Sequence, residues 1–385
     1  MAFWFLLIFK TTLKVNISFP KIFFIIATTF ALFAIFVVAR PILIPISFAL
    51  LISFILLPLA IRFENAGVNR MGAAMFAILS TILVLGGGIY LFSTQIISMT
   101  GEFSNFQGKV IQIFAETTAW LNSNMRIVPN LEKDELMDQL KNWLSESSGS
   151  LVQQTFSGSA GFIAGLIATI IFTFLFLIYR AGFKQAFVLF YPEEKRGQAM
   201  RMLKSIQMVG QKYLVGVILI VIIIGIINSV ALLIIGIDYP FFFGFLAAIL
   251  AIIPYVGTTL GATIPVLYAF MTYDSLWTPI AVSITFWAIQ VVESNFLSPK
   301  IVGGTLKVNA LAAIISIIVG ASVWGIAGMI LFLPFTAMLK VVCQEYDDLK
   351  PIALFIGEQN VKEKSIDIKA LSHWRVKLKD WFSKL

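Results

Sequence analysis

Eight long apolar segments dominate the chain, and short polar stretches separate them. A helix that crosses about 30 Å of hydrocarbon needs about 20 residues, and most of the segments are close to this length. The pattern predicts an all-α, polytopic integral membrane protein. The segments lie at Lys21 to Ala39, Pro41 to Ile61, Met71 to Ser93, Phe156 to Tyr179, Tyr213 to Ile237, Phe241 to Tyr273, Trp277 to Leu297 and Asn309 to Val342.

Two of these segments are too long for one crossing and too short for two. Pro254 divides the segment Phe241 to Tyr273, and a cluster of glycines around Trp324 divides the segment Asn309 to Val342. At about 1.5 Å per residue, each half is shorter than a full crossing. Both segments are therefore predicted to be helical hairpins that enter the bilayer and turn back.

The first break lies in the stretch AIIPYVGTTLGATIPVL. In lipid, every backbone group that a break frees needs a partner inside the protein or in a water-filled cavity, so the break marks a candidate site. We expect amide and carbonyl groups at this tip to face a solute or ion. The alternative is close helix packing, which the four-residue spacing of the two glycines also favours. The candidate pathway residues here are Pro254, Gly257, Thr258 and Gly261.

Charged residues predict the orientation of the spans. Residues 180–212 hold seven basic residues against two acidic ones, whereas residues 100–155 hold four basic and seven acidic residues. Because basic loops stay in the cytoplasm, we interpret residues 180–212 as a cytoplasmic loop. Counting crossings from this loop places both termini inside and residues 100–155 outside.

The same count gives the two hairpins opposite directions. One spanning helix with a hairpin from outside, followed by one spanning helix with a hairpin from the cytoplasm, is the order of an inverted repeat. Interrupted helices at matching positions of such repeats indicate a transport site. We therefore expect the second tip, with Gly320 and Gly325, to share one central pathway with the first.

Composition agrees with this architecture. Of the 385 residues, 59% are hydrophobic and 12% are charged, whereas about 25% are charged in an ordinary soluble domain. The single cysteine, Cys343, excludes a disulfide framework within the chain. The predicted parts are the N-terminal transmembrane helices (1–98), extracytoplasmic amphipathic helices (99–156), a transmembrane helix with the basic loop (157–212), the inverted-repeat transport core (213–342) and a basic cytoplasmic tail (343–385).

Three motifs in the second half carry a family resemblance. They are PYVG at Pro254 to Gly257, ESNFLSPKIVGG at Glu293 to Gly304 and VGASVWGIAGMILFLPFTAML at Val319 to Leu339. In order and spacing they resemble the signature of the AI-2E (autoinducer-2 exporter) family, over roughly Tyr213 to Val342. The resemblance implies a permease-like protein of the bacterial inner membrane, often oligomeric. It also implies either export of autoinducer-2 or exchange of sodium or lithium against protons.

Glu293 is the most informative ionisable residue. A carboxylate within a membrane helix costs a few kcal/mol or more, so it normally faces the protein interior or a watery cavity. Gln290, Glu293 and Ser294 share one helical face. This face predicts a proton or cation site; the alternatives are a buried ion pair with Lys300 or Lys307 and the capping of a hairpin end.

Two asparagines complete the candidate pathway. Asn228, next to Ser229, lies midway along a spanning segment and can hydrogen-bond either a solute or a neighbouring helix. The resemblance places Glu293 at the family's acidic position, and Asn295 follows it by two residues.

The sequence holds no pattern for enzyme chemistry. The only histidine, His373, lies in the tail, so the membrane body has no His-based triad or histidine zinc motif. The stretch GEFSNFQGKV at Gly101 to Val110 lacks the first glycine and the Ser or Thr of a phosphate loop. We expect no enzyme activity, no cofactor and no bound metal. Basic residues flank apolar segments, so we expect no nucleic-acid partner.

Two peripheral regions have amphipathic patterns. Residues 100–155 alternate apolar and charged positions at helical spacing, which predicts helices outside the membrane. The tail from Lys362 to Leu385 places leucine and tryptophan on one face beside lysine and arginine. This pattern is typical of a helix on the anionic inner leaflet, and a coiled-coil contact between subunits is the alternative.

Together these features favour a membrane transporter that exports a small polar organic solute, such as autoinducer-2, or exchanges a monovalent cation for protons. Its expected partners are that solute or ion, the lipid bilayer and further copies of the chain. The alternative is a non-transporting membrane scaffold that recruits partners through its external helices and tail.

The orientation can be tested with introduced cysteines. Cysteines at Asn124 and Ser147 should react with an impermeant thiol reagent in intact cells, because the acidic segment lies outside. A cysteine at Gln198 should react only after the cells are permeabilised. Labelling at Gln198 with protection at Asn124 in intact cells would overturn the orientation and the inverted repeat with it.

Overall fold

The computed structural model describes residues 19–99, 116 and 133–358. Helices form the regular structure of these residues, apart from one isolated β-bridge between Val308 and Gly357. The longer helices are α2 (Phe19–Val38), α3 (Arg40–Asn65), α4 (Arg70–Met99), α6 (Lys133–Leu189), α7 (Arg196–Ile235), α8 (Pro240–Leu250), α9 (Val256–Thr272), α10 (Trp277–Val292) and α12 (Ala310–Glu345). Short elements are η1 (Glu193–Lys195), η2 (Glu293–Leu297), η3 (Pro299–Gly303), α11 (Gly304–Leu306), η4 (Asp347–Leu349) and α13 (Lys350–Ile356).

Six helical stretches in the described part of the chain are long and apolar enough to cross a membrane. Their exposed side chains are largely Phe, Ile, Leu and Val, as expected where lipid rather than water surrounds the protein. The prediction of an all-α, polytopic membrane protein is therefore confirmed.

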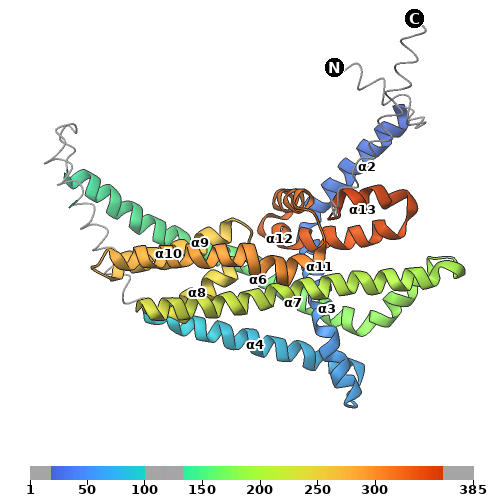
Figure 1. Cartoon of the computed structure of the whole chain (residues 1–385), viewed down its shortest axis with the longest axis horizontal. Coiled ribbons are helices and arrows are strands. Elements are labelled where there is room, and N and C mark those ends of the chain that lie inside the picture. Colours follow the sequence, from blue (N-terminus) through green and yellow to red (C-terminus); the bar gives the residue numbers. More distant parts are fainter. Residues whose placement is uncertain (1–18, 100–115, 117–132, 359–385) are drawn as a thin grey trace, which may run out of the picture.

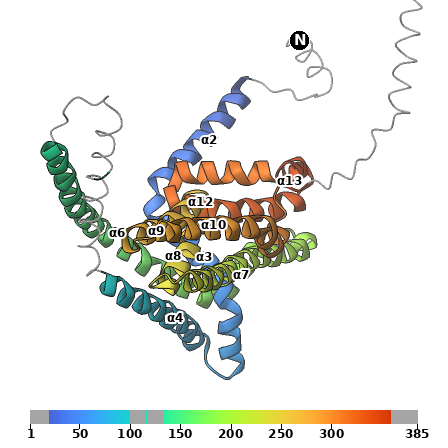
Figure 2. The ribbon, with the colours of Figure 1, turned by 60° about the vertical axis from the view of Figure 1, so that its left-hand side comes forward.

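The N-terminal helices pack around α3, which contacts both α4 and α6. The core between them contains Leu56, Ala60, Ala77 and Leu177. At one end of this core, Arg180 of α6 forms a partly buried ion pair with Glu64 of α3. Helix α2 instead projects away from the body in both views (Figures 1 and 2).

The cytoplasmic location of the basic segment 180–212 stays a prediction, but the segment is largely helical rather than irregular, with a break at residues 190–192. Helix α6 continues to Leu189 and α7 begins at Arg196. The reason is that α7 keeps an inward apolar face beyond the span, where Ala199 and Met202 are buried. Gln198 of this part donates to the Glu345 carbonyl at the end of α12, at 2.7 Å.

The first predicted hairpin consists of α8 and α9. Its arms touch through glycine, because a Cβ on Gly257 would lie 1.6 Å from the Leu250 carbonyl oxygen and one on Gly261 would lie 2.9 Å from the Ala247 Cα. At the tip, Tyr255 has φ 65° and ψ −55°, and the Val256 N–H donates to the Pro254 carbonyl at 2.7 Å. These values describe a γ-turn, a strained conformation for a residue other than glycine.

The second predicted hairpin lies within α12. The chain reverses at Gly325, whose φ is 59° and ψ −136°. A Cβ on Gly328 would lie 1.9 Å from the Gly320 carbonyl oxygen, and the Ser316 and Thr336 hydroxyl oxygens are 2.7 Å apart. A straight helix would separate those two hydroxyls by about 30 Å, so the two arms lie side by side.

The two hairpins begin and end at opposite ends of α7, as an inverted repeat requires. Where hairpin α8–α9 ends, the Tyr273 hydroxyl donates to the Gly236 carbonyl just after α7, at 2.9 Å. Where α12 ends, the Glu345 carbonyl accepts from Gln198 in the first turn of α7. Figure 1 shows the yellow and orange-red hairpins reaching inward from the two ends of this long helix.

The chain after α12 folds back onto the start of that helix. The Asn309 side chain caps α12 by accepting from the Ala312 N–H at 2.8 Å. Its amide group also donates to the carbonyls of Phe355 and Gly357, at 2.6 and 3.0 Å. One side chain therefore fixes both the beginning of the second hairpin and the end of α13.

Most of the predicted external segment and the tail Lys362 to Leu385 fall outside the described residues. The backbone of α6 is continuous from Lys133 into the span. The amphipathic character of both regions stays a prediction.

The glycine contacts predict which small substitutions disrupt the fold. Gly257→Ala and Gly328→Ala should each lower the free energy of unfolding by about 3 kcal/mol or more, because a methyl group would overlap backbone atoms of the facing arm. Gly87→Ala, in an open part of α4, should be neutral or stabilise by up to about 1 kcal/mol. Thermal unfolding in detergent measures all three. Equal stability of the three variants would contradict the close approach of the arms.

Candidate functional site

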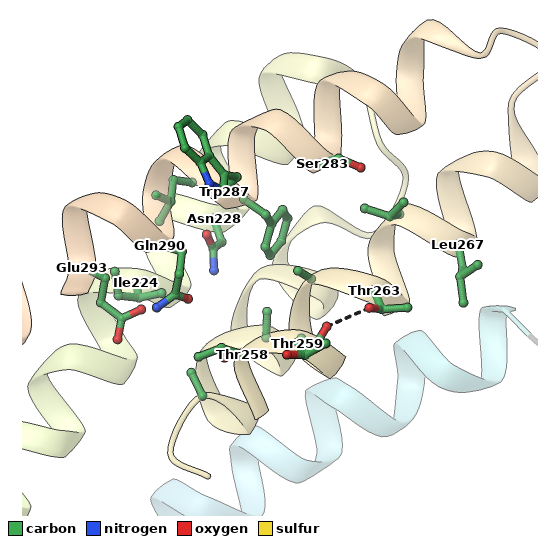
Figure 3. A pocket seen from close by; sticks show the side chains of 17 residues that line it. Ile224, Asn228, Thr258, Thr259, Thr263, Leu267, Ser283, Trp287, Gln290 and Glu293 are labelled. Carbon is green, nitrogen blue, oxygen red and sulfur yellow. Dashed lines mark hydrogen bonds between the residues drawn. The ribbon is translucent and has the colours of Figure 1, made fainter. Parts of the chain in front are cut away.

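A cavity of about 430 Å³ lies between α7, the hairpin α8–α9 and α10 (Figure 3). Its position follows from the broken helix, since α8 stops at Leu250 and leaves room beside α7. The cavity is mostly apolar with a few polar groups, as small-molecule sites generally are. The lining residues with polar side chains are Asn228, Thr258, Thr259, Thr263, Ser283, Gln290 and Glu293, with Trp287 also carrying an indole N–H.

Asn228 lies in the middle of α7 and is 3% exposed. Its Oδ1 is buried and has no hydrogen-bond partner among the described residues. The neighbouring Ser229 faces α8 instead, because a Cβ on Gly244 would lie 2.3 Å from its Oγ. The Ser229 hydroxyl donates to the Gly225 carbonyl of its own helix at 2.7 Å, whereas the Asn228 amide faces the cavity.

Glu293 lies where α10 changes into the π-helix η2, and it is 9% exposed. The Ser298 hydroxyl donates to its Oε1 at 3.5 Å, and Gln290 lies one turn before it on the cavity wall. No Lys or Arg of the described ranges forms an ion pair with this carboxylate, so the alternative of a pair with Lys300 or Lys307 is not supported. The carboxyl group instead borders the cavity (Figure 3).

The π-helix explains why two neighbours of Glu293 lie away from the cavity. A π-turn closes with i→i+5 hydrogen bonds rather than i→i+4, so residues after the change leave the earlier helical face. Ser294 and Asn295 are exposed. The Asn295 amide group donates to the Val291 carbonyl at 2.8 Å. Asn295, a predicted pathway residue, is therefore outside the cavity lining.

The tip of the first hairpin satisfies much of its own backbone. The Gly257 N–H donates to the Ile253 carbonyl at 3.0 Å, and the Thr259 N–H donates to the Tyr255 carbonyl at 3.4 Å. Pro254 and Gly257 shape the turn without lining the cavity, whereas Gly261 lines it. The expectation that amides of this tip face a solute is therefore wrong for these two N–H groups.

The second hairpin tip lies elsewhere. Trp324 stacks on Phe36 of α2 with ring centroids 5.8 Å apart, and its indole N–H donates to the Phe36 carbonyl at 2.9 Å. Gly320 and Gly325 are not among the cavity residues. The structure does not bring the two tips together around one cavity, because the second packs against α2 and α3.

The spacing of residues along the chain indicates the remaining polar lining residues. Thr259 and Thr263 lie one helical turn apart in the stretch AIIPYVGTTLGATIPVL, next to the predicted residue Thr258. Ser283 and Trp287 lie four residues apart on α10, and Gln290 follows three residues later. Extending the helical face of Gln290 by two turns toward the N-terminus would have found both.

With this geometry established, similarity to known proteins identifies the chain. Residues 22–348 match the sequence model of a protein family that is described as AI-2E family transporter. The chain belongs to the AI-2E transporter family. The AI-2E motifs at Pro254, Glu293 and Val319 lie in this matched range, so the resemblance seen in the sequence is confirmed.

Relatives of this AI-2E chain cover most of its length. YrrI of Bacillus subtilis (strain 168) is 28% identical over 323 residues, 79% of this chain and 86% of YrrI. The AI-2 transport protein TqsA of Escherichia coli (strain K12) is 25% identical over 330 residues, 84% of this chain and 91% of TqsA. The family and these spans make the chain a multi-pass membrane transporter.

Access to the cavity of this AI-2E transporter can be measured with cysteines. In a Cys343→Ser background, Thr258→Cys should react with methyl methanethiosulfonate, because the side chain at this position borders open space. Ala337→Cys should stay protected, since that position is 1% exposed. Mass spectrometry of the purified protein gives both rates. An inert Thr258→Cys would show that the cavity is closed to small polar molecules.

Proposed function

We propose that this transporter moves a small polar organic solute or a monovalent cation through the cavity beside α7, with Asn228, Gln290 and Glu293 as its polar contacts. The observation that carries the proposal is the unpartnered Asn228 oxygen in the same cavity as the Glu293 carboxyl group. Leaving a buried polar group without a partner costs about 1–3 kcal/mol. A protein gains from keeping such a group when a ligand supplies the missing partner.

The position of the cavity supports a transport role. The cavity adjoins a helix that is interrupted between Leu250 and Val256, and interrupted helices form the substrate sites of many secondary transporters. Its polar residues come from four elements, α7, α9, α10 and η2. A relative movement of the hairpin against α7 and α10 would therefore open or close the cavity around the solute that Asn228, Gln290 and Glu293 hold.

We further propose that Glu293 exchanges protons during the cycle. A carboxyl group in a membrane interior is costly and is commonly part of a proton or ion pathway. Gln290 and Ser298 offer hydrogen bonds to it without a fixed positive charge. Such neighbours allow both the charged and the neutral form, whereas a salt bridge would favour only the charged one.

The remaining parts of this proposal concern the cellular setting. We propose a location in the bacterial inner membrane with both termini in the cytoplasm, which the charge distribution supports. Autoinducer-2 as a candidate solute rests on the name of TqsA, an AI-2 transport protein, and export as the direction rests on the family resemblance. Assembly into a homo-oligomer rests on the family resemblance.

The role of Glu293 can be tested by flux through purified protein in liposomes. Glu293→Gln keeps nearly the same shape but cannot release a proton, so flux should lose its dependence on a pH gradient while the protein still folds. Glu194→Gln removes the same charge from an exposed position before α7 and should behave as the wild type. Wild-type coupling in Glu293→Gln would exclude the proton role, and loss of expression would indicate a structural one.

A further inference from the structure

The hydroxyl groups of the cavity can act only as acceptors toward a ligand. A hydroxyl has one hydrogen to donate, and each of these already donates it to a carbonyl of its own helix. The remaining lone pairs are what a solute meets. The bonds are Thr258 and Thr259 to the Tyr255 carbonyl, both at 3.0 Å, and Thr263 to the Thr259 carbonyl and Ser283 to the Pro279 carbonyl, both at 2.8 Å.

The other polar groups add to this excess of acceptors. An ionised Glu293 carboxylate only accepts hydrogen bonds, and the Asn228 Oδ1 is an acceptor without a partner. The side-chain donors of the lining are the amide groups of Asn228 and Gln290 and the indole N–H of Trp287. Lys, Arg and His are absent from the lining residues. An anionic solute would therefore meet a carboxylate and no positive charge.

The helix N-terminus next to the cavity does not change this balance. Free N–H groups at a helix start commonly bind anions. At the start of α9, however, two of these groups donate to carbonyls of the turn, Val256 to Pro254 and Gly257 to Ile253, and the Thr259 N–H makes the first bond of the helix, to Tyr255. The backbone thus offers little for an anion at this tip.

Size and aromatic lining indicate an organic solute. The cavity volume of about 430 Å³ lies in the range of about 300–1,000 Å³ that is usual for small molecules. A directly bound metal ion instead needs oxygen ligands converging at about 2–3 Å. Phe286 and Trp287 also border the cavity, and aromatic faces attract organic cations.

We propose that the solute is a small organic cation with a protonated amine, whose N–H groups bond to Asn228 Oδ1 and to the Glu293 carboxylate. Its carbon skeleton would lie against Phe286 and Trp287. This inference rests on the proposed function, and it narrows the solute to one chemical class. A neutral polyol or a carboxylate of the same size would bind more weakly, because each replaces a charged donor by a group that the lining matches less well.

Three probes that share one skeleton test the class. Ethanolamine, ethylene glycol and glycolate differ in the charge of one end group. In purified Cys343→Ser, Thr258→Cys protein at neutral pH and fixed ionic strength, ethanolamine should slow labelling by methyl methanethiosulfonate, and the other two should not at equal concentration. Adding Glu293→Gln should raise the ethanolamine concentration needed by about tenfold to hundredfold, the effect of losing one charged hydrogen bond. Adding Glu194→Gln should leave it unchanged.

The outcomes separate this inference from the proposed function. Protection by ethylene glycol or glycolate in place of ethanolamine would overturn the cationic class and leave the cavity as a solute site. Equal labelling with and without all three probes would contradict the cationic class and also count against solute binding in this cavity. Protection by ethanolamine that is unaffected by Glu293→Gln would overturn the assigned contact.

Discussion

A helix that stops inside a bilayer leaves amide and carbonyl groups without water, so the chain itself must supply their partners. The first hairpin meets this constraint within its own turn, where the Val256 and Gly257 N–H groups donate to carbonyls of the preceding residues. The turn closes only because Tyr255 adopts a positive φ and because Gly257 has no Cβ to strike Leu250. With these backbone groups already used, recognition of a solute depends mainly on side chains that face the cavity.

Both hairpins obey this constraint, yet their surroundings differ in chemistry. Each reverses at a residue with positive φ, Tyr255 in one and Gly325 in the other, and in each a glycine meets the backbone of the facing arm. The arm after the first tip presents Thr258, Thr259 and Thr263 toward an open cavity. The second tip instead places Trp324 between Phe36 and Phe332. The two halves therefore share an architecture, and the first places the arm after its tip beside the cavity that Asn228 and Glu293 also line.

The sequence predicted the parts of the fold that depend on length, apolar pattern and helix breaks. Pro254 and the glycines around Trp324 predicted where each hairpin turns. The count of crossings from the basic segment predicted that the two hairpins have opposite directions, in agreement with their attachment at opposite ends of α7. The sequence could not show which helix each tip would pack against, because the Trp324 contact with Phe36 joins residues far apart in the chain. Asn295 lies outside the cavity for a local reason. A helical face that is drawn with 3.6 residues per turn does not continue through a π-turn, and the residue pattern does not predict where a π-turn occurs.

That π-turn also connects the cavity to the second hairpin without requiring their tips to meet. After Glu293 the chain forms η2 and η3, and η3 packs against α7. At this contact a Cβ on Gly216 of α7 would lie 3.3 Å from the Ile301 carbonyl oxygen. The chain then reaches Lys307, whose carbonyl accepts from the Lys340 amine of α12 at 2.5 Å. The short segment after Glu293 is thus held against α7 at Ile301 and against the second hairpin at Lys307. The segment between Glu293 and Lys307 therefore joins the cavity to the second hairpin, although the two hairpin tips do not meet.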